Sequence, residues 1–200
     1  MPKEILTRRG FLKGAGLAAA GAAIAESGIA AMAEESTGSS NRAVGPGMVA
    51  VTLRINGQTK KLSIEPRTTL AEALRYHVDM TGTKIVCDRG SCSACTVWMD
   101  GTPELACMTL ALDAQGKEIT TIEGLARGDE LHPVQEQFIE HDAMQCGFCT
   151  PGMIMSCAAL LEKNKSPSLE DVKTAVSGNL CRCGTYPKVF DATLAAAKKS

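Results

Sequence analysis

One short stretch of the sequence decides the fold: Cys87-Asp88-Arg89-Gly90-Ser91-Cys92-Ser93-Ala94-Cys95, followed by a fourth cysteine at Cys107. The spacing C-x4-C-x2-C with a later cysteine is that of plant-type [2Fe–2S] sites. In such a site three thiolates come from one loop wrapped around two sulfide-bridged irons, and the fourth comes from a neighbouring strand. The small residues between the cysteines allow the loop to turn and to expose N–H groups. The spacing therefore predicts a first iron–sulfur site.

A second set of four cysteines follows the pattern C-x2-C…C-x-C, at Cys146, Cys149, Cys181 and Cys183. The first pair precedes a predicted helix that starts near Pro151, and the N-terminus of a helix favours a negative group. The second pair precedes the last predicted helix and could converge on the same point. We therefore predict a second [2Fe–2S] site. The ninth cysteine, Cys157, is interpreted as a small buried core residue.

Three other uses of these cysteines compete with iron–sulfur binding. Disulfides would suit a protein exported from the cytoplasm, which the N-terminus described below indicates. However, nine is an odd number of cysteines, and pairs as close as Cys92/Cys95 and Cys181/Cys183 form disulfides poorly with each other. A four-cysteine zinc site also uses C-x2-C pairs, yet the first triplet and the C-x-C pair fit zinc less well. The C-x2-C-x2-C-x3-C-P run typical of a [4Fe–4S] module is missing.

Composition limits the class of protein. The 200 residues are enough for one or two small domains. A formal net charge of −1 gives no basic field that would indicate a nucleic-acid partner. Aromatic residues make up only 4%, and small domains with modest cores often depend on metals or disulfides.

The segment before the second cysteine set predicts an α+β domain over residues 48–124. Apolar residues alternate from Val49 to Ile55, as in a half-buried strand, and Asn56-Gly57 is a strong hairpin signal. Leu62 and Ile64 continue the alternation on the return strand, and Thr69-Leu70-Ala71-Glu72 is a capping box. Two further strands are expected at Thr96–Met99 and Ile119–Ile122, with a turn at Asp100-Gly101.

After Gly124 the apolar period becomes helical, which predicts an all-α domain over residues 125–200. The first helix would use Leu131, Val134, Phe138 and Ile139, with Pro133 near its first turn. The other three are expected at 151–163, after Ser168 until Gly178-Asn179, and at 189–199.

The N-terminus is interpreted as a targeting signal and not as part of the fold. Thr7-Arg8-Arg9-Gly10-Phe11-Leu12-Lys13 is a twin-arginine pattern, and the apolar stretch 17–25 is too short and weak to span a bilayer stably. Ala31-Met32-Ala33 offers a cleavage signature, so residues 1–33 are predicted to be a twin-arginine signal peptide and 34–47 a linker. The alternative is a retained membrane anchor. The twin-arginine route exports folded protein, which suits cofactors loaded in the cytoplasm and predicts a periplasmic location.

Four motifs resemble the small iron–sulfur subunit of the xanthine oxidase (molybdenum hydroxylase) family, of the periplasmic aldehyde oxidoreductase or isoquinoline oxidoreductase type. They are VCDRGSCSACTV at 86–97, AC at 106–107, QCGFCTPGM at 145–153 and GNLCRCGTY at 178–186. Two positions depart from the family pattern: Ser93 and Val86 stand where the family often has glycine. A positive φ at Ser93 would strain the loop without removing a ligand.

The resemblance implies a ferredoxin-like β-grasp domain followed by a four-helix [2Fe–2S]-binding domain. It also implies a large partner subunit that holds molybdopterin, often as the cytosine dinucleotide. By the same resemblance the helical-domain cluster lies nearer the pterin, and Gln145 and Cys183 face it. A competing role for Gln145 is to cap the nearby helix.

The function implied is electron transfer. The partner would oxidise aldehydes or N-heterocycles, and the two clusters would relay single electrons to an acceptor, either a FAD-binding subunit or a cytochrome c. No catalytic residue is expected on this chain, and His77, His132 and His141 are interpreted as surface or capping residues. The alternatives are a free-standing two-cluster ferredoxin-type carrier and a metal-stabilised binding module.

The twin-arginine pattern gives a direct prediction. Replacing both Arg8 and Arg9 with Lys should leave folded, cluster-bearing protein in the cytoplasm, because the export signal is lost while the domains behind it are unchanged. Cell fractionation followed by iron analysis of each fraction measures this. An unchanged periplasmic yield would contradict the prediction.

Overall fold

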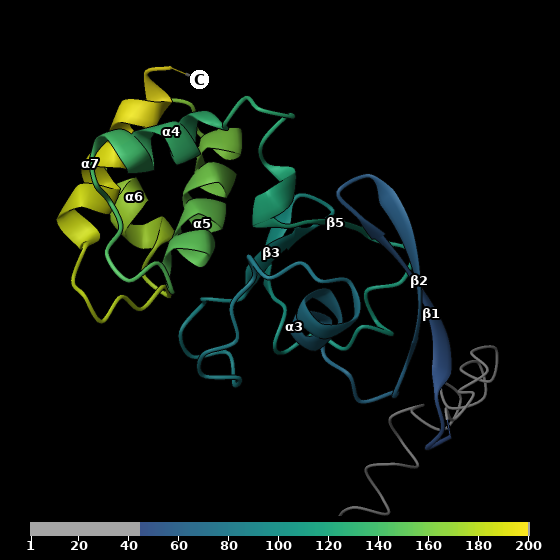
Figure 1. Cartoon of the computed structure of the whole chain (residues 1–200). Coiled ribbons are helices and arrows are strands. Elements are labelled where there is room, and N and C mark those ends of the chain that lie inside the picture. Colours follow the sequence, from purple (N-terminus) through teal and green to yellow (C-terminus); the bar gives the residue numbers. More distant parts are fainter. Residues whose placement is uncertain (1–44, 200) are drawn as a thin grey trace, which may run out of the picture. The chain divides into compact units, whose positions relative to one another are not determined.

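The computed structural model describes residues 45–199. The predicted signal peptide at 1–33 and all but the end of the predicted linker at 34–47 lie outside the described residues. The described part contains two hydrophobic cores, one built around a sheet and one among helices (Figure 1). In this part of the chain no helix is long and apolar enough to cross a membrane.

The first core lies under a five-stranded sheet of order β2-β1-β5-β3-β4. Its strands are β1 (Val49–Ile55), β2 (Gln58–Ile64), β3 (Thr96–Met99), β4 (Thr102–Leu105) and β5 (Glu118–Thr120). The pair β1·β5 is parallel and the other pairs are antiparallel. This is the mixed α+β arrangement that the sequence predicted.

The hairpin of β1 and β2 turns at Asn56-Gly57, where both residues have positive φ, as such a turn requires. Val51, Leu53 and Ile55 are buried, which confirms the predicted alternation. The Asn56 side chain also ties the turn to the segment after β5: its Oδ1 accepts from the Thr121 N–H at 2.9 Å. The hairpin is thereby fixed to the middle of the sheet.

A short helix packs on this sheet. Helix α3 (Leu70–Glu72) begins with the predicted capping box, in which Thr69 Oγ1 accepts from the Glu72 N–H and the Glu72 carboxylate accepts from the Thr69 N–H. It continues as a π-helical turn, η1 (Ala73–His77). Leu70 and Leu74 are fully buried in the first core, as expected.

Two details of the sheet differ from the sequence prediction. Strand β5 ends at Thr120, and a short 3-10 helix, η2 (Ile122–Gly124), follows where the strand was expected to continue. Strand β4 was not predicted. It contains Pro103, which a sheet accepts here because β4 is an edge strand.

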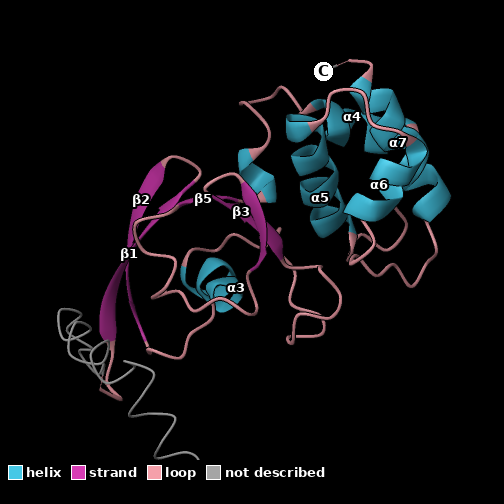
Figure 2. Cartoon of the chain, turned by 180° about the vertical axis from the view of Figure 1, so that it is seen from behind, coloured by secondary structure: helices cyan, strands magenta, loops and turns pink. Residues whose placement is uncertain are grey.

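The second core lies among four helices, α4 (Pro133–Glu140), α5 (Thr150–Lys163), α6 (Leu169–Ala175) and α7 (Tyr186–Ala197), shown in cyan in Figure 2. Ser168 caps α6 as predicted. Helix α7 begins at Tyr186 rather than Val189, since Pro187 suits the first turn of a helix. Leu131 was expected within the first of these helices but lies before α4, and both Leu131 and Ile139 are exposed.

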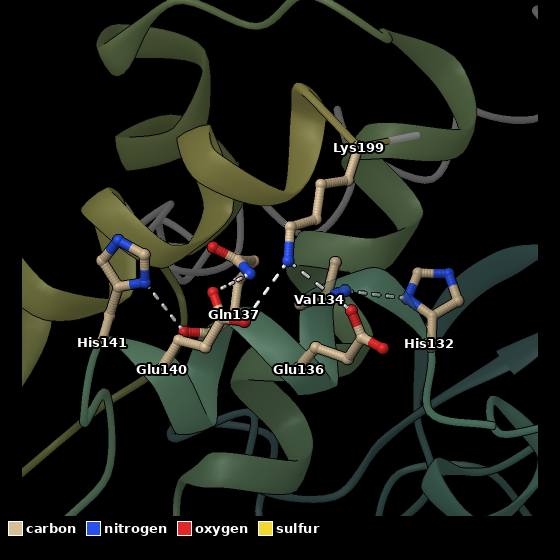
Figure 3. A network of polar contacts seen from close by, with 7 residues as sticks. All are labelled: His132, Val134, Glu136, Gln137, Glu140, His141 and Lys199. Atoms are coloured by element: carbon tan, nitrogen blue, oxygen red, sulfur yellow. Dashed lines mark hydrogen bonds and ion pairs between the residues drawn. The ribbon is translucent and has the colours of Figure 1, made fainter. Parts of the chain in front are cut away.

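A polar network joins α4 to the end of α7 (Figure 3). Lys199 Nζ lies 3.3 Å from Glu140 Oε1 and 3.8 Å from Glu136 Oε2. His132 caps α4, because its Nδ1 accepts from the Val134 N–H at 3.2 Å, and burial lowers the pKa of His132, which favours the neutral ring that this bond needs. His141 closes the other end of α4 through Gln137 O. Both histidines therefore have the capping role that the sequence suggested.

Candidate functional site

The first cysteine set lies on the loop between η1 and β3 and on the turn after β4. Cys92, Cys95 and Cys107 are buried and Cys87 is half-buried. Cys107 follows the end of β4 instead of lying within a strand, which is a small departure from the expected arrangement. All nine cysteines lie within the described residues, and all are free thiols.

The loop around this set supplies N–H groups to sulfur. The Gly90 N–H donates to Cys107 Sγ at 3.4 Å, and the Ser91 N–H donates to Cys87 Sγ at 3.3 Å. A hydrogen bond from the Arg89 N–H is the main cause that lowers the pKa of Cys87 to about 7. The loop therefore favours negative charge at its exposed end.

Several residues of this loop adopt positive φ, which is how it curls around its cysteines. Gly90 has a φ of 72°, as a glycine can without cost. Asp88 and Ser93 each have a φ of 53°. The strain expected from a serine at position 93 is thus present in the backbone, and the loop must be held in this shape by its surroundings.

The second set is built at the starts of two helices. Cys146 and Cys149 lie on either side of Gly147-Phe148, and Cys149 is the residue that precedes α5. The Phe148 N–H lowers the pKa of Cys146. Helix α5 also directs its free N–H groups and the positive end of its dipole toward this loop.

The other two thiols of the second set precede α7. Burial raises the pKa of Cys181, but hydrogen bonds from the Thr185 side chain and backbone outweigh it and bring the pKa to about 7. Thr185 Oγ1 lies 3.2 Å from Cys181 Sγ. Tyr186 fixes the backbone here, because its hydroxyl accepts from the Cys181 N–H and donates to Asn179 O, each at 2.9 Å.

Within each set the thiols meet in pairs. In each pair the two thiols lie close enough for one to shift the pKa of the other, and the pairs are Cys87/Cys92, Cys95/Cys107, Cys146/Cys183 and Cys149/Cys181. Over residues 45–199, no three His, Cys, Asp or Glu side chains gather closely enough to hold a single metal ion. A [2Fe–2S] cluster takes two protein ligands at each of its irons, so two thiol pairs in each set are the donor arrangement that it needs.

A buried hydroxyl beside the second set also fits a cluster. Thr150 follows Cys149 directly, and its Oγ1 is buried with no hydrogen-bond partner among the described residues. Buried polar groups of this kind normally have a partner. A sulfur acceptor held by Cys149 and its neighbours would supply one, so the residues present fit an iron–sulfur group. When bound, such a group supplies single-electron transfer.

Comparison with known families places both sets within iron–sulfur domains. The family described as "2Fe-2S iron-sulfur cluster binding domain" matches residues 53–118, and the family described as "[2Fe-2S] binding domain" matches residues 121–194. The aldehyde oxidoreductase iron-sulfur-binding subunit PaoA of Escherichia coli O157:H7 is 41% identical over 96% of this chain and 88% of its own length. The chain is an iron–sulfur subunit of the molybdenum hydroxylase family.

Other members of the molybdenum hydroxylase family show the same relationship. The nicotine 6-hydroxylase small subunit of Paenarthrobacter nicotinovorans is 45% identical over 74% of this chain and 89% of its own length. In the crystal structure of quinoline 2-oxidoreductase from Pseudomonas putida 86, one chain is 44% identical and matches with a TM-score of 0.73. The match covers 76% of this chain and 94% of that one. The predicted fold, with a ferredoxin-like β-grasp part before a helical part, is confirmed.

The structure also shows where the two residues expected near the pterin lie. Gln145 and Cys183 line one surface cavity of about 340 Å³, together with Asp142, Thr185 and Lys188. Sequence reasoning did not assign roles to Thr150, Tyr186 or the side chain of Asn179, although all three lie within quoted motifs. The Asn179 side chain contacts a residue distant in the sequence, and the role of Thr150 depends on burial. The Tyr186 hydroxyl binds backbone groups of Cys181 and Asn179, and the cysteine spacing does not indicate this loop geometry.

The unpartnered hydroxyl of Thr150 gives a prediction for the helical part. Thr150→Val should lower the reduction potential of the cluster held there, because hydrogen bonds to cluster sulfur favour the reduced, more negative state. A hydrogen bond of about 1 kcal/mol corresponds to roughly 40 mV for one electron, which is the upper limit of the expected shift. A redox titration followed by EPR measures the potential.

The matched control for this prediction is Thr174→Val, on an exposed position of α6. It makes the same chemical change outside both cysteine motifs, and it should leave both potentials unchanged. Equal potentials for the wild type and Thr150→Val would show that the hydroxyl makes no contact with the cluster.

Proposed function

We propose that the eight paired cysteines hold two [2Fe–2S] clusters and that electrons pass through this chain in a fixed order. They enter from the molybdenum cofactor of the large partner subunit at the helical set and leave through the ferredoxin-like set to an acceptor. The helical set is Cys146, Cys149, Cys181 and Cys183; the ferredoxin-like set is Cys87, Cys92, Cys95 and Cys107. No residue of this chain takes part in the oxidation of substrate.

The observation that carries this proposal is a hydrogen bond between the two ligand loops. The Leu180 N–H donates to Cys92 O at 3.1 Å. Cys92 belongs to the first set, and Leu180 is bonded directly to Cys181 of the second. A short path of covalent bonds with one hydrogen bond therefore connects a ligand of one set to a ligand of the other.

Exposure supports the direction of the relay. Cys146 and Cys183 are exposed, whereas three of the four thiols in the ferredoxin-like set are buried. A group on a partner subunit can approach the helical set directly, through the cavity that Gln145 and Cys183 line. Among the described residues the Gln145 side chain makes no hydrogen bond to the start of α5, so we assign it to the pterin rather than to capping of the helix.

The names of the relatives guide the rest of the assignment. Two of them are named as subunits, of an aldehyde oxidoreductase and of a nicotine 6-hydroxylase, and the solved structure is a quinoline 2-oxidoreductase. We accordingly propose an aldehyde or N-heterocycle as the substrate class and molybdopterin cytosine dinucleotide as the partner's cofactor. The acceptor would be a FAD-binding subunit or a cytochrome c, and the complex would be periplasmic after folded export. The free-standing ferredoxin-type carrier is disfavoured, because these relatives are named as subunits.

Metal content tests the ligand assignment. The complex isolated without air should contain about four irons and four acid-labile sulfides per copy of this chain, from two clusters of two. Reduced samples should give two distinct EPR signals. Zinc in place of iron in such samples would overturn the assignment.

Replacing Gln145 tests the order of the relay. Gln145→Ala retains all eight thiols and removes one exposed side chain beside Cys146, so both clusters should still assemble. We expect a perturbed molybdenum EPR signal or slower reduction of the helical cluster by substrate, with the EPR signal of the ferredoxin-like cluster unchanged. Rapid-freeze EPR after mixing with substrate measures both.

Gln58→Ala, at an exposed position of strand β2, is the control for this experiment, and it should behave like the wild type. An effect of Gln145→Ala confined to the ferredoxin-like cluster would show that the proposed order is wrong.

A further inference from the structure

The backbone carbonyl of Ser93 is a point where the two ligand loops meet. Ser93 follows Cys92, and its carbonyl accepts from Thr96 Oγ1 at 2.8 Å and from Asn179 Nδ2 at 3.2 Å. Asn179 is buried and lies just before Leu180-Cys181. One oxygen atom of the ferredoxin-like loop is therefore held by a side chain of the helical loop.

Helix α5 also packs closely against the Ser93 carbonyl oxygen, at the position of a glycine. A Cβ atom built on Gly152 would lie 2.2 Å from Ser93 O and 3.1 Å from the Cα of Ala94. Both of these are backbone atoms, so neither can move aside as the end of a flexible side chain could. Gly152 lies in the first turn of α5, shortly after Cys149, and is buried.

The need for glycine at this position comes from space. Gly152 does not adopt the positive φ that marks several glycines of this chain. Within a helix, alanine is intrinsically more favourable than glycine. The only feature of Gly152 that the structure uses is its missing side chain, which lets α5 lie directly against the ferredoxin-like loop.

We propose that Gly152 and Asn179 are positioning residues that set the separation of the two clusters. Gly152 determines how closely the start of α5 approaches the loop between Cys92 and Cys95, and Asn179 fixes that approach through its hydrogen bond to Ser93 O. This inference rests on the proposed relay. The rate of electron tunnelling falls steeply with distance, so this contact determines how fast electrons cross between the two sets.

Gly152→Ala tests the proposal in the assembled complex. The added methyl group must push α5 away from the loop, so the magnetic coupling between the two reduced clusters should weaken, because it falls with the cube of their separation. Electron transfer from the helical to the ferredoxin-like cluster should slow several-fold. The thermal unfolding midpoint should fall, whereas glycine to alanine in an unobstructed helix raises it.

Gly178→Ala is the matched control. It places the same methyl group at the same junction, but its nearest neighbour is the Ser93 hydroxyl at 3.1 Å, which can rotate away. Coupling and transfer rate should stay near the wild-type values. The g-values of each cluster report local distortion, and we expect them to be unchanged in both variants.

Asn179→Leu tests the second residue and does not depend on whether Gly152→Ala assembles. It keeps a side chain of similar size and removes the donor to Ser93 O, and it should also weaken the coupling. Wild-type coupling and transfer rate in Asn179→Leu, or altered g-values with unchanged coupling in Gly152→Ala, would overturn the proposal. Reduction of both clusters by substrate in the wild type is measured alongside. Its failure would reject the relay itself, independently of the positioning roles.

Discussion

Each cluster site must bring four thiols together from segments that are distant in the sequence, and the rest of the structure depends on that convergence. Burial opposes ionisation: it raises the pKa of both Cys95 and Cys149 to about 12. Iron binds thiolates, so metal binding has to offset the free-energy cost of ionising these buried thiols. Metal binding is therefore coupled to folding. Cys95 and Cys107 belong to the first hydrophobic core, and Cys149 and Cys181 pack against the second. In a chain with 4% aromatic residues, the ligands are thus part of what holds each core together.

The two sites are also tied to each other. Each contact that joins them involves a backbone atom: the Leu180 N–H on Cys92 O, the Asn179 side chain on Ser93 O, and the backbone of α5 at Gly152 against Ser93. Trp98 adds a fourth link from the sheet, because its indole N–H donates to Met155 O in α5 at 2.9 Å. Backbone contacts hold a distance more rigidly than long side chains can. This arrangement suits a chain whose function is to move electrons between two fixed points.

Local pattern predicted much of the structure, and its failures have a common physical cause. The alternation in β1, the caps at Thr69 and Ser168, and the burial of Cys157 all follow from short-range rules, and the structure has them. Strand β4 was missed because proline rarely marks a strand, and only its place at the edge of the sheet makes it acceptable. The junction at Ser93 was missed because the separation between its partners exceeds any local pattern. The sequence indicated only one feature of this junction, namely that a positive φ at Ser93 would strain the loop.

Exposed apolar side chains around the cysteine ligands agree with the membership of this chain in a multi-subunit family. Val86, Met108, Phe148 and Leu180 are each more than half exposed, and each lies beside a cysteine of one of the two sets. Large apolar side chains in contact with water are costly, and when they gather around functional loops they usually mark surfaces that another chain covers. The glycines and serines of these loops allow them to curl tightly around sulfur, but they cannot shield it. The apolar neighbours shield it only in part, and a subunit that packs on them would complete the environment of the clusters.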